Sequence, residues 1–264
     1  MVSLSFGMLC WGVCHQLRIP NASPNQEKWY GLFVFSSTLV TYNFQRLIKF
    51  TQLKSKHSDH MVWVFAHRKQ LYFLVLIGSL LCGLSFFKIY YHQSNVLPLL
   101  IFSAIISFLY VVKIGNISLR ERPHLKIHLI AIVSMIAIGF IRLINENNFN
   151  RNNWFFALAH YFYFVAITIP FDIRDLKFDS PSLRTIPQVF GIQKSRIISI
   201  GLFGLYLFIL LLFKTTIYKN PAFIISCLLA IMLLLKTNDK RPDFYFSGII
   251  ESSIFIMGLS YLVV

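Results

Sequence analysis

The feature that most constrains this chain is a series of long apolar runs separated by polar pieces. Hydrophobic residues make up 56% of the 264 residues and charged residues only 13%, with a mean hydropathy of +0.63. Soluble globular domains carry about 25% charged residues. The composition therefore excludes that class and predicts an integral membrane protein.

Nine runs are long enough, as helices, to approach the ~30 Å apolar core of a bilayer. They cover residues 2–17, 28–47, 70–88, 95–113, 125–143, 153–171, 196–213, 220–236 and 244–264. Runs of this length indicate helices rather than barrel strands, because a helix satisfies its backbone polar groups within its own segment. No stretch resembles a soluble domain, so residues 1–264 are expected to form a single all-α membrane domain.

The chain has 25 Lys and Arg against 10 Asp and Glu, a surplus that could indicate nucleic-acid binding. However, 18 of these basic residues fall in the connections between runs 2 and 3, 4 and 5, 6 and 7, and 8 and 9. The positive-inside rule makes those connections cytoplasmic. We therefore expect a cytoplasmic N-terminus, an outer C-terminus, the inner membrane if the source is bacterial, and no nucleic-acid partner.

Three of the ten acidic residues lie together at the end of the sixth run: Asp172, Asp175 and Asp179, here called the aspartate cluster. In a helix turning by about 100° per residue they occupy an arc of roughly 60°, with Arg174 and Lys177 on the opposite side. Carboxylates about 6 Å apart repel by about 1–3 kcal/mol per pair at an effective dielectric of about 20–80. This spacing favours a shared cation.

A divalent metal ion would relieve this repulsion. Carboxylate oxygens suit Mg²⁺, which proteins often hold jointly with the phosphates of a substrate. The aspartate cluster therefore supplies the candidate metal ligands and catalytic residues. The alternative is a solvated loop in which these acids balance nearby Lys and Arg.

The connection after the second run has the same predicted orientation and could face the aspartate cluster across the bundle. It is basic and has no carboxylate before Asp59. Arg46 and Lys49 near its start could contact phosphate oxygens directly. Each could equally be an ordinary positive-inside anchor.

The string Asp172-x-x-Asp175-x-x-x-Asp179, followed by Arg184-Thr185 and Gly191, resembles the UbiA superfamily of intramembrane prenyltransferases. The second aspartate-rich motif of that family, D-x-x-D-x-x-x-D, is complete here. The nine runs and the cytoplasmic loops after the second and sixth also resemble it. A weaker match is Tyr110 at the end of the fourth run, with the basic loop that contains Lys113, Arg120, Arg122, Pro123 and Lys126.

The first motif of that family, N-D-x-x-D-x-x-x-D, is degenerate here. The matching positions are Asn43, Phe44, Leu47 and Thr51, so that only the asparagine remains. Losing these carboxylates should remove most of one metal site, and metal ions neutralise charge on a departing diphosphate. Arg46 and Lys49 could then supply cationic contacts in place of that metal.

The resemblance implies a nine-helix membrane bundle and an enzyme. The enzyme would use Mg²⁺ to transfer an isoprenoid group from a prenyl diphosphate to a lipophilic or aromatic acceptor within the membrane lipid. It implies that the aspartate cluster binds the metal. It also implies a set of substrate contacts: Asn43, Arg46, Lys49, Tyr110 and Arg184.

Two other interpretations stay open. The missing first motif favours a catalytically inactive UbiA-like scaffold or a lipid-binding subunit of a membrane complex. An ion-coupled transporter would need ionisable residues inside its spans, whereas Arg142, His128 and Glu251 lie near the ends of theirs. The aromatic residues from Tyr161 to Phe164 could line an isoprenoid pocket or could simply pack helices together.

Overall fold

The structure, a computed structural model, describes residues 1–16, 24–52, 66–92, 97–113, 118–140, 151–212 and 216–263. These residues form nine α-helices and no strand, which confirms the predicted all-α class. The helices are α1 (Val2–Gln16), α2 (Pro24–Gln52), α4 (Arg68–His92), α5 (Leu97–Leu109), α6 (Leu125–Met135), α8 (Arg151–Asp175), α9 (Ile186–Leu212), α10 (Pro221–Lys236) and α11 (Glu251–Leu262). Two π-helical segments, Ile136–Phe140 and Tyr245–Ile250, extend α6 and precede α11.

Several helices are suited to a membrane. Four helical segments are long and apolar enough to cross one: Arg68–Tyr90, Trp154–Asp175, Ile186–Leu212 and Tyr245–Leu262. Three shorter helices are also apolar: Leu97–Leu109, Leu125–Ile138 and Pro221–Lys236. Four to seven membrane spans are therefore supported by length and hydropathy within the described residues, where the sequence alone predicted nine.

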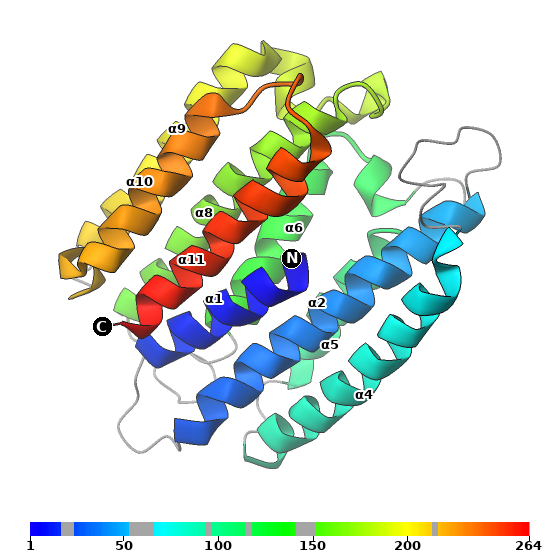
Figure 1. The fold of residues 1–264 in the computed structure, drawn as a ribbon, viewed down its shortest axis with the longest axis vertical. Helices are drawn as coiled ribbons and strands as arrows, with labels where there is room; N and C mark the ends of the chain where they lie inside the picture. The colour runs from blue at the N-terminus through cyan, green and yellow to red at the C-terminus, as the bar shows by residue number, and fades with distance from the viewer. Residues whose placement is uncertain are drawn as a thin grey trace.

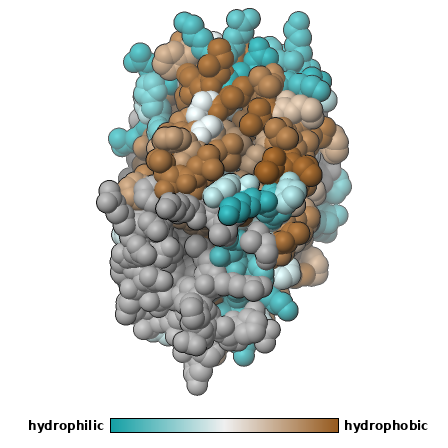
Figure 2. All heavy atoms as spheres, turned by 90° about the vertical axis from the view of Figure 1, so that its left-hand side faces the viewer, coloured by the Kyte–Doolittle hydropathy of each residue, from teal (hydrophilic) through white to brown (hydrophobic). Residues whose placement is uncertain are grey.

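The outer surface carries large apolar side chains that water would not favour. Figure 2 shows a broad apolar face on the side of the molecule where α9 and α10 lie, with polar side chains gathered at the top of the view. The exposed apolar residues of α9 and α10 include Ile197, Leu205, Phe208, Leu211, Ile225, Leu228 and Leu235. An apolar face of this extent, bounded by polar groups, is typical of a surface that contacts lipid.

The chain folds so that its first and last helices pack against each other (Figure 1). α1 lies between α2 and α11, α2 pairs with α4, and α8 pairs with α9 and with α6. The Ser5 hydroxyl donates a hydrogen bond of 2.7 Å to the Glu251 carbonyl oxygen, so the starts of α1 and α11 lie at the same end of the bundle.

Glycines allow α1 to approach its neighbours closely. A Cβ atom added at Gly12 would lie 2.2 Å from the carbonyl oxygen of Gly258 on α11. One added at Gly31 on α2 would lie 2.9 Å from Cβ of Trp11 on α1. Small residues at helix interfaces let backbones approach within van der Waals contact, which is a main source of helix association in membranes.

The boundaries of two helices near the aspartate cluster differ from the predicted ones. α8 continues past the predicted end at 171 to Asp175, although it contains Pro170. α9 begins at Ile186 rather than near 196, and its first turn is separated from the rest by Gly191 with φ 75°. Glycine adopts this conformation without steric cost. The apolar run begins only near 196, so hydropathy did not predict the helical turn that precedes Gly191.

We predict that Gly12→Ala lowers the free energy of unfolding by about 1–3 kcal/mol, because the added methyl group overpacks the contact between α1 and α11. The measurement is the thermal midpoint of the detergent-solubilised protein. Gly83→Ala is the matched control, since an added Cβ there meets no atom within 4 Å. Equal midpoints for the two variants would contradict the close packing of α1.

Candidate functional site

The aspartate cluster lies where α8 ends. Asp172 is in the last turn of α8 and Asp175 is its last residue. The chain then turns tightly, because the backbone N–H groups of Phe178 and Asp179 both donate to the carbonyl oxygen of Asp175 at 2.8 Å. This turn returns Asp179 to the end of the helix, so the three carboxylates gather although only two of them are helical.

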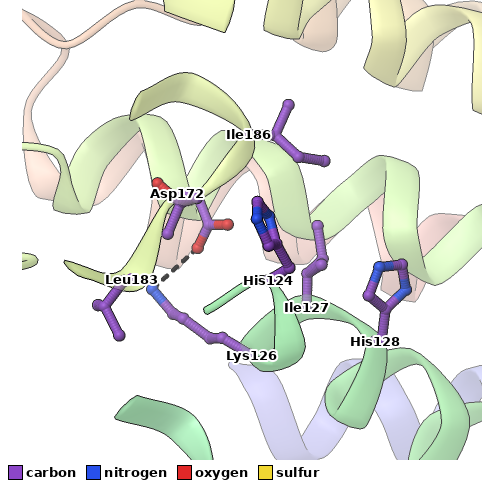
Figure 3. Close-up of a pocket in the computed structure, with 8 residues that line it drawn as sticks. His124, Lys126, Ile127, His128, Asp172, Leu183 and Ile186 are labelled. Atoms are coloured by element: carbon purple, nitrogen blue, oxygen red, sulfur yellow. Dashed lines mark ion pairs between the residues drawn. The ribbon is translucent and has the colours of Figure 1, made fainter. Parts of the chain in front are cut away.

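The three carboxylates surround a single side chain, Lys126 from the first turn of α6. Its Nζ lies 2.8 Å from Oδ1 of Asp172. It lies 3.4 Å from Oδ2 of Asp175 and 2.8 Å from Oδ2 of Asp179. Figure 3 shows the Lys126 side chain reaching from α6 to Asp172. Lys126 is 7% exposed and Asp172 is 1% exposed, so this ion cluster is largely shielded from water.

The backbone before Lys126 is held by a contact with the other side of the site. His124, just before α6, has φ 62°, and its N–H donates a 3.0 Å hydrogen bond to the carbonyl oxygen of Leu183. Arg184, next to Leu183, also has a positive φ, of 47°. Such non-glycine conformations cost about 1–3 kcal/mol each and persist where surrounding contacts hold them. The start of α6 is thereby fixed against the turn at 181–183.

The second basic residue at the cluster is Arg174. Its Nε donates a 2.8 Å hydrogen bond to Oδ1 of Asp175, and its guanidinium lies over the rings of Phe171 and Phe246. The expectation that Arg174 points away from the acidic face is therefore wrong, because its long side chain folds back at the helix end. Lys177 is exposed. Asp175 thus joins two cations, Arg174 and Lys126.

A further basic group, Arg46 of α2, has an available hydrogen-bond donor. Its guanidinium lies 4.3 Å from the centre of the Tyr42 ring and donates to the Tyr42 hydroxyl at 3.1 Å. Its Nε is buried and has no hydrogen-bond partner among the described residues. The buried Glu251 interacts electrostatically with both Arg46 and Arg174. An unpaired buried donor is costly, so Arg46 is suited to a ligand with acceptor oxygens.

The degenerate first motif contributes no carboxylate to the site. Asn43 is buried, and its amide donates a 2.7 Å hydrogen bond to the carbonyl oxygen of Leu39 in its own helix. Leu47 packs against Leu71 of α4, and Phe44 is exposed. Lys49 and Thr51 belong to α2, but their side chains lie outside the described part of the chain.

The remaining predicted substrate contacts, Tyr110 and Arg184, differ in their surroundings. Tyr110 follows α5 and is buried beside Val111 and Leu129, with the Arg120 guanidinium 5.7 Å from its ring centre. Burial raises the pKa of the Tyr110 phenol, although the nearby positive charges of Arg120 and Lys126 oppose this shift. Tyr110 therefore stays a neutral hydrogen-bond donor near neutral pH. Arg184 is exposed.

A small cavity of about 40 Å³ lies beside the cluster (Figure 3). It is lined by His124, Lys126, Ile127, His128, Asp172, Leu183, Thr185 and Ile186. Oγ1 of Thr185 is buried and has no hydrogen-bond partner among the described residues. Oδ1 of Asp172 is also buried, and its neighbour there is the Lys126 ammonium at ion-pair distance. The cavity has room for a few water molecules, and is too small for an isoprenoid.

The aromatic run before the cluster is mainly packing. Tyr163 and Phe164 are buried, and the Tyr163 ring lies 5.2 Å from that of Tyr206 on α9. Tyr161 differs, because its hydroxyl lies 2.6 Å from Nδ1 of His128, a residue that borders the small cavity. Only Tyr161 of this run is therefore placed beside the site.

The cluster as arranged does not fit Mg²⁺. No group of three or more His, Cys, Asp or Glu side chains is positioned to hold a metal ion within the described residues. The point that the three carboxylates share is taken by the Lys126 ammonium. Mg²⁺ needs oxygen ligands at about 2.0–2.1 Å, so an ion at this point would require Lys126 to leave.

The whole chain has the fold of UbiA homologs of known structure. The structure of a UbiA homolog from Archaeoglobus fulgidus matches with a TM-score of 0.62 at 16% identity, over 100% of this chain and 97% of that one. A structure of a UbiA homolog from the same organism bound to DMAPP and Mg²⁺ matches with a TM-score of 0.57 at 14% identity, over 100% and 96%. A third structure, of a UbiA homolog from the same organism bound to Cd²⁺, matches with a TM-score of 0.59 at 16% identity, over 100% of this chain and 97% of that one. No protein-family model and no curated protein sequence matches the chain.

These matches confirm the UbiA resemblance at the level of the fold. They extend over the full chain, whereas the motif that carried the resemblance in the sequence spans only Asp172 to Asp179. Lys126 was named from the sequence only as a member of the basic loop after the fourth run, with no role at the aspartate cluster. Its signal was weak, since it stood in the sequence as one of several basic residues in a loop.

We predict that Lys126→Gln lowers the free energy of unfolding by about 3–5 kcal/mol, because it leaves buried carboxylates without their counter-ion. The thermal midpoint of the purified protein measures this loss. Lys177→Gln removes the same charge from an exposed position and should change stability by less than about 0.5 kcal/mol. Similar midpoints for the two variants would contradict the ion cluster.

Proposed function

We propose that this chain is a UbiA-type prenyltransferase-like membrane protein. It binds the diphosphate of an isoprenoid diphosphate at the end of the bundle where the aspartate cluster lies, and it transfers the isoprenoid group to a lipophilic or aromatic acceptor. The observation that carries this proposal is the convergence of a complete D-x-x-D-x-x-x-D motif at one point of a UbiA-like fold. A UbiA homolog with this fold is bound to DMAPP, a prenyl diphosphate.

Basic and neutral donors around the cluster are suited to the diphosphate. Arg46 and Arg174 present guanidinium groups, whose planar donors match phosphate oxygens. Tyr110 offers a neutral hydroxyl. In the transfer, the bond between the isoprenoid carbon and the diphosphate oxygen breaks, and the diphosphate leaves with the electron pair. The acceptor bonds to that carbon and loses a proton.

The rate of such a reaction depends on charge stabilisation at the leaving diphosphate. Preorganised cations are most effective in a site that excludes water, and Lys126 is already held in one position by three carboxylates. The complex of the homolog contains Mg²⁺ besides DMAPP. Because Lys126 occupies the centre of the aspartate cluster here, no step of the transfer is assigned to a metal ion.

The proposal places the aspartate cluster and the N-terminus on the cytoplasmic side, with the C-terminus outside and residues 1–264 as one membrane domain. Exposed basic residues support this orientation. Lys177 and Arg184 follow α8, and Lys240 and Arg241 precede α11. A surplus of exposed Lys and Arg marks the cytoplasmic end of a membrane bundle.

A non-catalytic, lipid-binding relative is the second candidate. It is favoured by one observation, the absence of carboxylates among the described side chains of α2 that correspond to the first motif. Such a protein would bind an isoprenoid lipid and leave its diphosphate intact. Release of inorganic diphosphate on incubation with acceptors separates the two candidates.

We predict saturable binding of prenyl diphosphates to the protein in nanodiscs, with the parent prenyl alcohols binding at least about 10-fold more weakly because they lack the charged group. Isothermal titration with diphosphates of increasing chain length measures this binding. Arg46→Gln should weaken it by about 10-fold, equivalent to about 1.4 kcal/mol.

Lys194→Gln provides the control for the charge change, because Lys194 is exposed on α9. This variant should bind as the unmodified protein does. Equal affinity for diphosphate and alcohol, or equal loss in the two variants, would reject a diphosphate site at this end of the bundle.

A further inference from the structure

We propose that the Lys126 ammonium is the resident cation of the aspartate cluster and takes the place that a divalent metal ion would occupy. The site of this chain therefore holds a lipid diphosphate without a metal ion. The part of this inference that concerns the diphosphate rests on the proposed function. The part that concerns the cation does not, and it is tested with metal ions alone.

Nζ of Lys126 is the atom on which the three carboxylates converge. It is at 2.8, 3.4 and 2.8 Å from one oxygen of each carboxylate, so a single atom faces all three members of the cluster. An ammonium has three donors and no acceptor, which matches three carboxylate neighbours. The side chain of Lys126 is 8% exposed and that of Asp179 is 10% exposed, so solvent cations have little access to the shared point.

The charges already present at the cluster disfavour a divalent cation. The aspartate cluster carries three negative charges, and Lys126 and Arg174 contribute two positive charges in direct contact with it. Adding a divalent ion beside both side chains would reverse the sign of the cluster. Like charges so placed repel strongly in a poorly solvated site, so a metal ion and Lys126 exclude each other.

A metal-binding arrangement of two facing acidic motifs would also need carboxylates on α2. Asn43 uses its amide within its own helix, and Leu47 packs against α4. Ile48 packs against the apolar group that contains Tyr110 and Leu129. The described side chains on this part of α2 thus offer no carboxylate to a metal ion at the aspartate cluster.

Lys126 is also held in position by its backbone. The His124 N–H bonds to Leu183 across the site, and α6 begins directly afterwards. Lys126 projects from the first turn of that helix and not from an unsupported loop. A metal ion would have to displace a side chain whose backbone is anchored and whose charge has three partners.

The test is binding of Mn²⁺, a spectroscopic substitute for Mg²⁺, measured by electron paramagnetic resonance on purified protein treated with chelator. The unmodified protein should bind no Mn²⁺ at the cluster. Lys126→Gln should bind about one Mn²⁺ per chain, because three hard carboxylate ligands then no longer face an ammonium. This binding should be lost in Lys126→Gln combined with Asp175→Asn, and Mn²⁺ should raise the thermal midpoint of Lys126→Gln alone.

Two variants serve as controls. Lys126→Arg keeps a cation at this position and should stay free of Mn²⁺. Asp239→Asn, in the loop before α11, should not change Mn²⁺ binding by Lys126→Gln. If the glutamine variant does not fold, the titration of the unmodified protein and of Lys126→Arg still decides the matter, because neither should bind the ion.

Binding of Mn²⁺ by the unmodified protein that is lost in Asp175→Asn would overturn the proposal. Failure of folded Lys126→Gln to gain Mn²⁺ would also overturn it, since the lysine would then not be what excludes the metal.

The diphosphate part of the proposal is tested by titrating a prenyl diphosphate with and without chelator. Chelator should leave the affinity unchanged, and a loss of 10-fold or more would refute metal-free binding. Absence of any diphosphate binding would refute the proposed function while leaving the metal result standing.

Discussion

Three carboxylates and one ammonium meet in a site that excludes most water, and this ion cluster determines how one end of the bundle is built. Buried charges require partners, because moving an unpaired ion out of water costs several kcal/mol. Lys126 meets this requirement for Asp172, Asp175 and Asp179 together, and in doing so connects α6 to the end of α8 and the turn that follows. The positive φ of His124 and its hydrogen bond to Leu183 belong to the same connection.

The rest of the bundle provides a rigid frame for that end. Glycines bring α1 within backbone contact of α2 and α11, and the Ser5 hydroxyl joins the starts of α1 and α11. Arg46 of α2 and Glu251 of α11 are thereby placed near Arg174 of α8. Charged groups from four helices, α2, α6, α8 and α11, thus gather at one end of the bundle.

Much of the fold followed from the sequence, because apolar runs of membrane length become helices in almost any context. The aspartate cluster was also predictable, since a periodicity of about 100° per residue brings Asp172 and Asp175 to one face. Asp179 reached the same point for a different reason, a tight turn after the helix end.

The partner of the cluster was not predictable in this way. Lys126 lies 46 residues before Asp172 in the sequence, and only the packing of α6 against α8 brings the two together. The direction of Arg174 was also missed, because helical phase places Cα atoms but does not determine where a long side chain folds back at a helix end. Local pattern therefore identified the acids, and tertiary contacts determined their counter-ion. The sequence-based inference of Mg²⁺ depended on that counter-ion being absent.

The most direct measurement is anomalous diffraction from crystals of the unmodified protein grown with Mn²⁺ and a prenyl diphosphate. The account predicts no anomalous peak among Asp172, Asp175 and Asp179, with Nζ of Lys126 at hydrogen-bond distance from their carboxylates and the diphosphate contacted by arginine side chains. A strong anomalous peak between those carboxylates, with Lys126 turned away, would contradict it.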